Sequence, residues 1–324
     1  MLTLLLSIRN LDVSYNTVAG TYKVIDSLNL DIDKGELIAL VGESASGKST
    51  LGQVISRMLP PVGKARGQVL LDGMDVLKMS EKEATNFRGT SVFMIFQNPL
   101  NSLNPVKRVG DQLLEALNVR NERSHRNLSD EESRREVLEA LTSVRLPDPE
   151  KIMSRYPHEL SGGQVQRVVI CMALLLQPKL LIADEPTTAL DVTVQAQVVT
   201  LLKDLSKKTE MSIIFITHDV ALAYVLSDKM LVFYAGRVME KGETLDLVKK
   251  PMHPYTAGLL ASIPTGPKNK GRLYSIPGSP PSYLSLPKGC KFTPRCKFAF
   301  EKCSGSEPKS VMASNRELRC WLYE

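Results

Sequence analysis

The residues best suited to chemistry form a glycine-rich segment at residues 42–49, GESASGKS, which fits the pattern G-x-x-x-x-G-K-[ST]. It follows an apolar run at 36–41 that we interpret as a strand. It precedes apolar residues at helical spacing, Leu51, Val54, Ile55 and Met58. Glycines let the backbone curl so that its N–H groups face phosphate oxygens, and the positive end of the next helix faces the same anion. The segment therefore predicts a site for the phosphates of ATP, made by Gly42, Ser44, Ala45, Ser46, Gly47, Lys48, Ser49 and Thr50. Within it, Lys48 should reach the β- and γ-phosphates, and the Ser49 hydroxyl should bind Mg²⁺.

Two carboxylates follow a second apolar run downstream. Residues 180–183, LLIA, read as a buried strand that ends in Asp184 and Glu185. Asp184 is expected to hold Mg²⁺ through water, and Glu185 to polarise the attacking water as a general base. Taken alone, the pair could equally cap a helix, because Pro186 follows. The phosphate-binding segment upstream favours the catalytic interpretation.

The string LSGGQ at residues 160–164 resembles the signature of ABC ATPases, and other motifs of that family occur in order from about residue 5 to 250. Gln97, in MIFQNPLNSLNP, resembles the Q-loop glutamine. Residues 189–191, ALD, resemble the D-loop with Asp191, and His218, in IIFITHD, resembles the switch histidine. Tyr15 stands where these proteins carry an aromatic residue that stacks on adenine, although the nearby Tyr22 could serve instead.

The resemblance implies how these residues would act. In this family two cassettes pack head to tail with ATP between them, so the signature residues would contact ATP held by the partner subunit: Ser161, Gly162, Gly163 and Gln164. Gln97 would sense Mg²⁺ and the attacking water while linking to a permease. His218 would contact the γ-phosphate and position Glu185. The alternative is a soluble ABC ATPase that acts in DNA repair, translation or cluster assembly. Repair members carry long coiled-coil insertions and translation members carry two cassettes, and this sequence shows neither feature. The intact Glu185 and His218 argue against a non-hydrolysing regulator.

The expected fold is α/β: a RecA-like P-loop ATPase core with a mostly parallel sheet, an antiparallel β subdomain, an inserted helical subdomain and a small cysteine-containing C-terminal extension. Residues 1–35 read as short strands, of which the first is an edge strand. Pro60-Pro61 should end the helix after the phosphate segment. We expect a strand and turn at 65–75, charged helices at 110–155, a strand at 213–217 and a hairpin at 232–242 around 235–236. A composition change near 250–265 indicates a nucleotide-binding domain at 1–255, with its helical subdomain at about 100–160, and an extension at 256–324.

The extension carries a more specific resemblance. Residues 253–256, HPYT, and 276–281, IPGSPP, resemble the C-terminal extension of ATPases from oligopeptide and dipeptide importers, as does the long Q-loop segment. Peptides are thus the favoured cargo, although nickel and sugar-oligomer importers share these features. The resemblance implies two transmembrane permease subunits, a second homologous ATPase in a heterodimer, an extracytoplasmic substrate-binding protein, and no nucleic acid.

Four cysteines lie in the extension with the spacing C-x5-C-x6-C-x16-C: Cys290, Cys296, Cys303 and Cys320. Four thiolates can hold a [4Fe–4S] cluster or a tetrahedral Zn²⁺ ion. The C-x2–4-C pairs typical of structural zinc are absent, and the tails of this subgroup resemble iron–sulfur sites, so we favour the cluster over zinc and plain thiols. Lys291, Arg295 and Lys297 could offset its charge or simply form a solvated basic surface. Cys171 is interpreted as a small core residue.

Composition sets the remaining bounds. The chain has 324 residues, 43% hydrophobic and 23% charged, with a formal net charge of +6. Residues 268–324 contain eleven Lys or Arg and four Asp or Glu, so the excess positive charge lies in this segment. The longest apolar run, 168–176, is too short to span a membrane, and the start lacks the features of a signal peptide. We expect a peripheral protein on the cytoplasmic face of the cell membrane.

Overall fold

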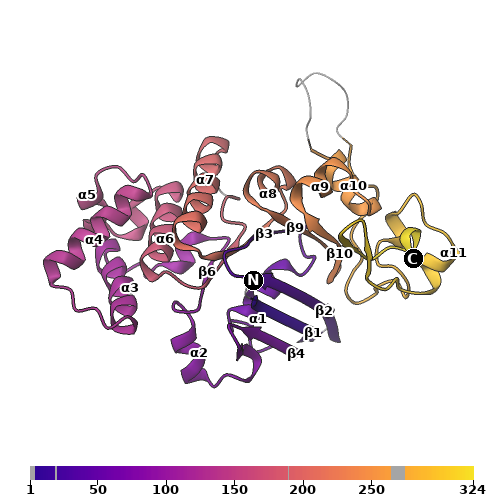
Figure 1. Ribbon diagram of the computed structural model, residues 1–324, viewed down its shortest axis with the longest axis horizontal. Helices are drawn as coiled ribbons and strands as arrows, with labels where there is room; N and C mark the ends of the chain where they lie inside the picture. The colour runs from indigo at the N-terminus through magenta and orange to yellow at the C-terminus, as the bar shows by residue number, and fades with distance from the viewer. Residues whose placement is uncertain (1–3, 19, 189, 264–273) are drawn as a thin grey trace. The chain divides into compact units, whose positions relative to one another are not determined.

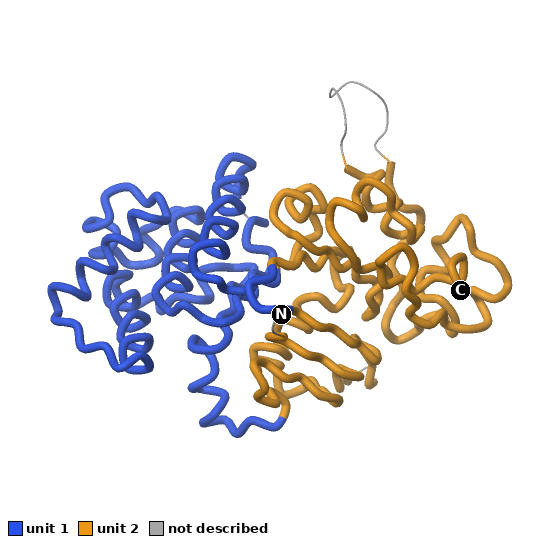
Figure 2. The backbone as a smooth tube through the Cα atoms, in the orientation of Figure 1, with its two compact units in different colours: residues 1–3, 33–36, 78–214 blue, residues 4–32, 37–77, 215–324 orange. Residues whose placement is uncertain are grey.

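A computed structural model describes residues 4–18, 20–188, 190–263 and 274–324. The chain forms two compact units, shown in different colours in Figure 2. Among the described residues, unit 1 contains 33–36 and 78–214, and unit 2 contains 4–32, 37–77 and 215–324. The chain therefore passes between the units several times, and neither unit is a single continuous segment. Among the described residues, no helix is long and apolar enough to cross a membrane.

Unit 1 is mainly helical (Figure 1). Its elements in chain order are α2 (Glu81–Phe87), β6 (Val92–Ile95), η2 (Pro99–Ser102), α3 (Val109–Arg123), α4 (Asp130–Ser143), α5 (Pro149–Ser154), η3 (Pro157–Glu159), α6 (Gly162–Leu176), β7 (Leu180–Asp184) and α7 (Val192–Thr209). Strand β8 (Ser212–Thr217) then leads into unit 2.

Helices α3, α4 and α5 confirm the charged helices predicted at 110–155. Helix α4 begins with a capping box. The Ser129 hydroxyl accepts from the backbone N–H of Glu132, and the Glu132 carboxylate accepts from the backbone N–H of Ser129. Leu113 and Leu117 of α3 are fully buried and lie on one face of that helix. Cys171 is also fully buried in α6, as predicted for a small core residue.

Strands β6 and β7 of unit 1 each precede a predicted catalytic residue, Gln97 and Glu185 respectively. They pair in parallel, with Ile95 opposite Ala183. The carboxyl ends of parallel strands meet at the same edge of a sheet, so the segments that follow both strands start side by side. The predicted strand at 180–183 is thereby confirmed, and it is followed by Glu185 in the left-handed backbone region, with φ 45°.

Unit 2 contains most of the strands (Figure 1). Its elements are β1 (Leu4–Thr17), β2 (Gly20–Asp33), β3 (Leu37–Val41), α1 (Lys48–Ile55), β4 (Gly63–Leu71), β5 (Met74–Asp75), η1 (Val76–Lys78, at the boundary with unit 1), α8 (Val220–Leu226), β9 (Lys229–Tyr234), β10 (Arg237–Glu243), α9 (Thr244–Lys249), α10 (Pro254–Ala261), η4 (Thr293–Arg295), α11 (Glu301–Gly305), β11 (Val311–Ala313), β12 (Arg316–Leu318) and η5 (Trp321–Tyr323).

The antiparallel sheet of unit 2 has the strand order β2-β1-β4-β5. The prediction that the chain begins with an edge strand is wrong, because β1 lies between β2 and β4 and pairs with β4 from Leu6 opposite Leu71 onward. The first two strands are also long, with 14 residues each, where short strands were expected. Leu6 and Ile8 are fully buried, as a central strand requires.

Unit 2 also contains a run of paired strands that extends from β3 to the C-terminal extension. Strand β3 pairs in parallel with β9, and antiparallel pairs then join β9 to β10, β10 to β12, and β12 to β11. The predicted hairpin at 232–242 is confirmed. Its two-residue turn places Ala235 and Gly236 at positive φ, as a tight hairpin that matches the twist of its strands requires.

Helix α1 is shorter than the sequence predicts. Pro60-Pro61 does not end it, because the helix stops at Ile55. The hydroxyl of Ser56 turns back to the carbonyl of Gly52, and Arg57 adopts a left-handed backbone with φ 56°. Met58 therefore leaves the predicted apolar face and is 39% exposed.

The C-terminal extension shares the core of unit 2. Phe292 packs its ring against Tyr234 and Tyr255, and Cys290 and Cys303 belong to the same buried cluster. The carboxylate of Glu240 in β10 is fully buried and accepts hydrogen bonds from the backbone of His253 and from Arg316 of β12. The division predicted at residue 255 stays a prediction.

Candidate functional site

The predicted phosphate-binding segment of unit 2 joins β3 to α1 and requires glycine at two of its positions. A Cβ atom on Gly42 would lie 2.1 Å from the carbonyl oxygen of Phe233, so no side chain fits there. Gly47 has φ 104°, and a Cβ atom there would lie 3.1 Å from the carbonyl oxygen of Val24. Ala45 also has positive φ, at 59°. The backbone thus makes the tight curl that a phosphate cradle requires.

Lys48 begins α1 and lies inside this curl. Its Nζ donates hydrogen bonds to the carbonyl oxygens of Gly42 and Glu43, both at 2.8 Å, and to the Ser46 hydroxyl at 3.2 Å. Its side chain is buried, as is that of Ser46, whereas Ser44, Ala45 and Ser49 are exposed. The ammonium group is therefore held by the loop that would surround an anion. Because the lysine side chain is already ordered, binding of a phosphate would cost less conformational entropy.

Both tyrosines considered for adenine stacking lie together in unit 2. The Tyr15 hydroxyl is 3.3 Å from the Thr50 hydroxyl and donates to Gln53 at 3.5 Å, which joins β1 to helix α1. The ring centroids of Tyr15 and Tyr22 are 6.0 Å apart. Tyr283 of the extension continues the row, with its centroid 6.3 Å from that of Tyr22.

Unit 1 brings together two of the predicted catalytic residues. Gln97 follows β6 and Glu185 follows β7, and the Gln97 side-chain amide donates to the Glu185 carboxylate at 3.2 Å. The hydroxyl of Thr188 donates to the same oxygen at 3.0 Å. Asp184 is buried at the end of β7 and does not cap a helix, since the next helix, α7, is capped by Asp191.

The LSGGQ segment forms the exposed start of α6 in unit 1. Ser161 caps the helix, and its hydroxyl accepts from the backbone N–H of Gln164 at 3.4 Å while the Gln164 side chain accepts from the Ser161 N–H at 3.0 Å. A Cβ atom on Gly162 would meet nothing within 4 Å, whereas one on Gly163 would lie 3.2 Å from Val194. The helix thus presents its positive end and an open glycine at the surface.

The remaining motif residues lie at strand and helix ends. His218 follows β8 and is exposed in unit 2, next to Asp219, which caps α8. In the D-loop, Ala189 lies outside the described residues. Asp191 caps α7 of unit 1 by accepting from the Val194 N–H at 3.0 Å.

The four cysteines of the extension are neighbours. Cys290, Cys303 and Cys320 are buried, and Cys296 is half-buried. Burial, reinforced by the charges of the other three, raises the pKa of the Cys320 thiol to about 11. The backbone N–H of Cys290 donates to the Cys303 carbonyl at 2.8 Å. Among the described residues, however, no group of three or more His, Cys, Asp or Glu side chains could hold a single metal ion.

Sequence reasoning missed three residues that contact the nucleotide-site candidates in unit 2: Tyr255, Tyr283 and Arg295. The Tyr255 hydroxyl accepts from the backbone N–H of Glu43, and the Arg295 guanidinium binds the Glu43 carboxylate. Tyr255 and Arg295 lie 212 and 252 residues from Glu43, and Tyr283 lies similarly far along the chain from its partner Tyr22. No local pattern could have revealed these contacts, although Tyr255 belongs to the HPYT motif.

Comparison with known proteins defines the family. Residues 25–188 match the ABC transporter family, and residues 239–303 match the family described as oligopeptide/dipeptide transporter, C-terminal region. The chain is similar to the oligopeptide transport ATP-binding protein OppD of Escherichia coli, with 44% identity covering 98% of this chain and 93% of that protein. It is also 42% identical to the dipeptide transport ATP-binding protein DppD of Bacillus subtilis, covering 98% and 95%.

Solved structures agree. The ATP-binding cassette MJ0796, solved as a dimer in a post-hydrolysis state with ADP and Pi, matches with a TM-score of 0.65 and 27% identity, covering 74% of this chain and 98% of that one. The chain belongs to the ABC transporter family, and within it to the oligopeptide and dipeptide transport ATP-binding proteins. It is an ATP-binding ABC-type ATPase with the cassette fold.

Proposed function

We propose that this chain hydrolyses ATP to power the uptake of di- or oligopeptides through partner permeases. The match of residues 239–303 to the oligopeptide/dipeptide transporter C-terminal region carries this proposal, because the ATPase cassette alone does not indicate which cargo is transported. The chain would bind two transmembrane permease subunits at the cytoplasmic face of the membrane, pair with a second homologous ATPase, and receive cargo through an extracytoplasmic binding protein.

In this proposal the loop around Lys48 and the Ser49 hydroxyl bind the triphosphate, with Tyr15 supporting adenine. Asp184 would hold Mg²⁺, and Glu185 would be the general base, held by the Gln97 amide. Mg²⁺ would neutralise charge on the β- and γ-phosphates. His218 would contact the γ-phosphate. A carboxylate that already accepts two hydrogen bonds is oriented before water arrives, which lowers the entropic cost of activating that water.

The signature segment would act on the ATP of the partner subunit. The exposed start of α6 offers a positive helix end, and the open space at Gly162 leaves room for a phosphate. Asp191 lies at the start of the neighbouring helix α7 in the same unit. ATP would therefore be held jointly by one subunit's loop and the other's signature, so that hydrolysis loosens the pair.

We also propose that the four-cysteine cluster (Cys290, Cys296, Cys303 and Cys320) binds [4Fe–4S]. The four thiols lie in one small extension, and Cys290 and Cys303 belong to one buried cluster on which Cys296 packs. Four thiolates could instead hold a tetrahedral Zn²⁺ ion. When bound, the [4Fe–4S] cluster would cross-link the loops of the extension. Anaerobic purification with iron and sulfide analysis tests this, and stoichiometric zinc or no metal would contradict it.

The transport function is tested by purifying the tagged chain from its native membranes and identifying what accompanies it. We expect two polytopic permeases, a second ATPase and an extracytoplasmic binding protein whose cargo can be measured directly. A binding protein specific for nickel or a sugar oligomer would replace the peptide cargo. Ribosomal, DNA-repair or cluster-assembly partners without a permease would overturn the transport function and leave the ATPase activity standing.

A further inference from the structure

The C-terminal extension contacts the phosphate-binding loop through a buried arginine. Arg295 ends η4, and its side chain is only 3% exposed. Its Nη1 donates to Glu43 Oε2 at 2.6 Å, and its Nη2 donates to Glu43 Oε1 at 2.9 Å. This is a two-pronged arginine–carboxylate pair, the geometry in which such ion pairs are strongest and most directional. Glu43 is the second residue of the loop, so the extension binds the loop itself.

The guanidinium of Arg295 is fixed from the side of the extension. Its Nε donates to the Pro277 carbonyl at 2.9 Å, and its Nη2 donates to the Ile276 carbonyl at 3.4 Å. The group also lies over the ring of Tyr234, 5.8 Å from its centroid. A guanidinium with so many fixed partners has little freedom left, so the position of Glu43 is set by the extension.

Glu43 in turn contacts the lysine of the loop. Its backbone carbonyl accepts from Lys48 Nζ at 2.8 Å, while its backbone N–H donates to the hydroxyl of Tyr255 at 3.0 Å. The side chain, the N–H and the carbonyl of one residue are therefore held by Arg295, Tyr255 and Lys48 respectively. Displacement of the Glu43 side chain would shift the carbonyl that orients the lysine ammonium.

Charge gives the ion pair a second consequence. A carboxylate in a phosphate-binding loop carries the same sign as the triphosphate and repels it. Arg295 neutralises Glu43 from the side of the extension, so the loop can keep an acidic residue without losing affinity for an anion. The tyrosine row gives a second contact to the same region, because Tyr283 of the extension packs against Tyr22, which packs against Tyr15.

We propose that the C-terminal extension is a working part of the ATP site, in which Arg295 is a positioning residue that holds and neutralises Glu43 of the phosphate loop. This inference rests on the proposed binding of ATP at that loop. It predicts that a change confined to the extension alters ATP affinity, and that the loss can be reversed in the loop by removing the charge of Glu43.

The test uses the full chain and compares its ATP dissociation constant, KM for ATP, kcat and thermal midpoint. Arg295→Ala should raise the dissociation constant and KM by about tenfold with a smaller change in kcat. Arg295→Lys should lie between it and the wild type, because it keeps the charge but loses the fork. Adding Glu43→Gln to Arg295→Ala should recover most of the affinity, an outcome that a merely structural role of Arg295 does not produce.

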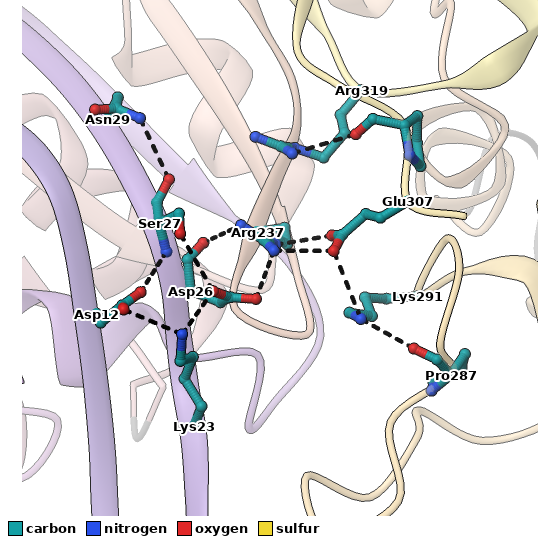
Figure 3. Close-up of polar contacts among 11 residues, drawn as sticks. Asp12, Lys23, Asp26, Ser27, Asn29, Arg237, Pro287, Lys291, Glu307 and Arg319 are labelled. Atoms are coloured by element: carbon teal, nitrogen blue, oxygen red, sulfur yellow. Dashed lines mark hydrogen bonds and ion pairs between the residues drawn. The ribbon is translucent and has the colours of Figure 1, made fainter. Parts of the chain in front are cut away.

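The matched control is Glu307→Gln, which weakens a different attachment of the extension (Figure 3). The Glu307 carboxylate pairs with Arg237 of β10 at 2.8 Å and with Lys291 at 3.6 Å, and Arg237 also binds Asp26 of β2. This variant should lower the thermal midpoint and leave ATP affinity unchanged. Equal losses of affinity in both variants, or no recovery by Glu43→Gln, would overturn the proposal. A wild-type chain that fails to bind ATP would instead refute the assigned ATP site.

Discussion

At the scale of single residues, the hydrogen bonds on Glu185 define a test of its role. Glu185→Gln should keep ATP binding but lower hydrolysis by roughly two to four orders of magnitude, because an amide cannot accept the proton of the attacking water. Phosphate release and size-exclusion chromatography with ATP measure the two effects, and ATP should trap the variant as a dimer. Glu139→Gln, on the exposed face of α4, is the control. Undiminished hydrolysis would remove Glu185 from its role.

Two glycines with nearly the same φ angle distinguish the cost of backbone strain from the cost of a steric clash when a side chain is added. Gly73 has φ +82° and open space around a Cβ atom, whereas Gly236 has φ +80° and a Cβ atom there would lie 2.2 Å from the Val24 carbonyl oxygen. Gly73→Ala should cost about 1–2 kcal/mol of unfolding free energy, the penalty of the left-handed backbone alone. Gly236→Ala should cost roughly 1–3 kcal/mol more, because the backbone must also move.

Denaturant unfolding measures both glycine variants. The Gly236 variant should also weaken ATP binding, since the Gly236 N–H donates to the carbonyl of Ser46 in the phosphate loop at 2.9 Å. The Gly73 variant should not. Equal destabilisation by the two substitutions would show that the hairpin turn relaxes away from Val24.

At the scale of elements, the start of α10 makes stability depend on pH. His253 caps the helix by accepting from the Tyr255 N–H at 3.0 Å, and complete burial lowers the pKa of its imidazole from 6.5 to about 3. The surrounding groups are the Glu240 carboxylate, which binds the His253 backbone N–H, the ring of Phe292 and the backbone of Arg319, which slightly opposes the shift.

Below pH 6.5 the unfolded chain takes up a proton on His253 that the folded chain refuses until about pH 3, so this contribution to stability is lost as the pH falls. Between pH 7.5 and 5 the loss should be about 2 kcal/mol. His253→Asn keeps an oxygen to cap α10 and should remove this component of the pH dependence in denaturant unfolding. His125→Asn, at an exposed site, should not. Parallel pH profiles for all three proteins would contradict the buried, neutral state of His253.

Elements defined by local patterns were predictable from the sequence, and those defined by distant neighbours were not. The strand and helix on either side of residues 42–47, strand β7, and the hairpin at 235–236 each depend on a few consecutive residues, and the structure confirms those elements. The position of β1 inside its sheet depends on β2 and β4, which no pattern within 1–17 specifies. The early end of α1 depends on a side-chain hydrogen bond of Ser56 and the left-handed backbone of Arg57.

The candidate site divides in the same way. Lys48 and Glu185 are predicted site residues because they sit in motifs whose residue types follow directly from phosphate and water chemistry. From the sequence alone, Arg295 is only one of several basic residues near the cysteines. Its partner Glu43 lies 252 residues away, so a contact of this kind becomes visible only when the chain is folded.

At the scale of the whole molecule, the signature segment should serve a partner subunit and not its own chain. Gly162→Asp places a carboxylate in open space at the first turn of α6, where the helix dipole favours negative charge. The thermal midpoint should stay unchanged or rise, with at most about 1 kcal/mol of added stability. ATP binding by the isolated chain should also be unchanged.

Hydrolysis by the Gly162→Asp variant should nevertheless fall at least roughly tenfold, because the new carboxylate would repel the γ-phosphate of ATP on the partner subunit. The variant thus uncouples stability from activity, and both are measured on one preparation. A weaker affinity of the isolated chain for ATP would indicate that the signature acts on the chain's own nucleotide. Normal hydrolysis would show that it lies away from any nucleotide.

The pairing of β12 with β10 has a consequence for how much of this chain can be removed. Strand β12 covers the hydrogen-bonding edge of β10, with Glu240 opposite Leu318, and Arg316 binds the buried Glu240 carboxylate. A chain ending near residue 255 would expose that edge and leave the carboxylate without its cation. Bare strand edges recruit strands from other molecules. Such a truncated ATPase would therefore aggregate before its catalysis could be measured, even though every catalytic motif would still be present.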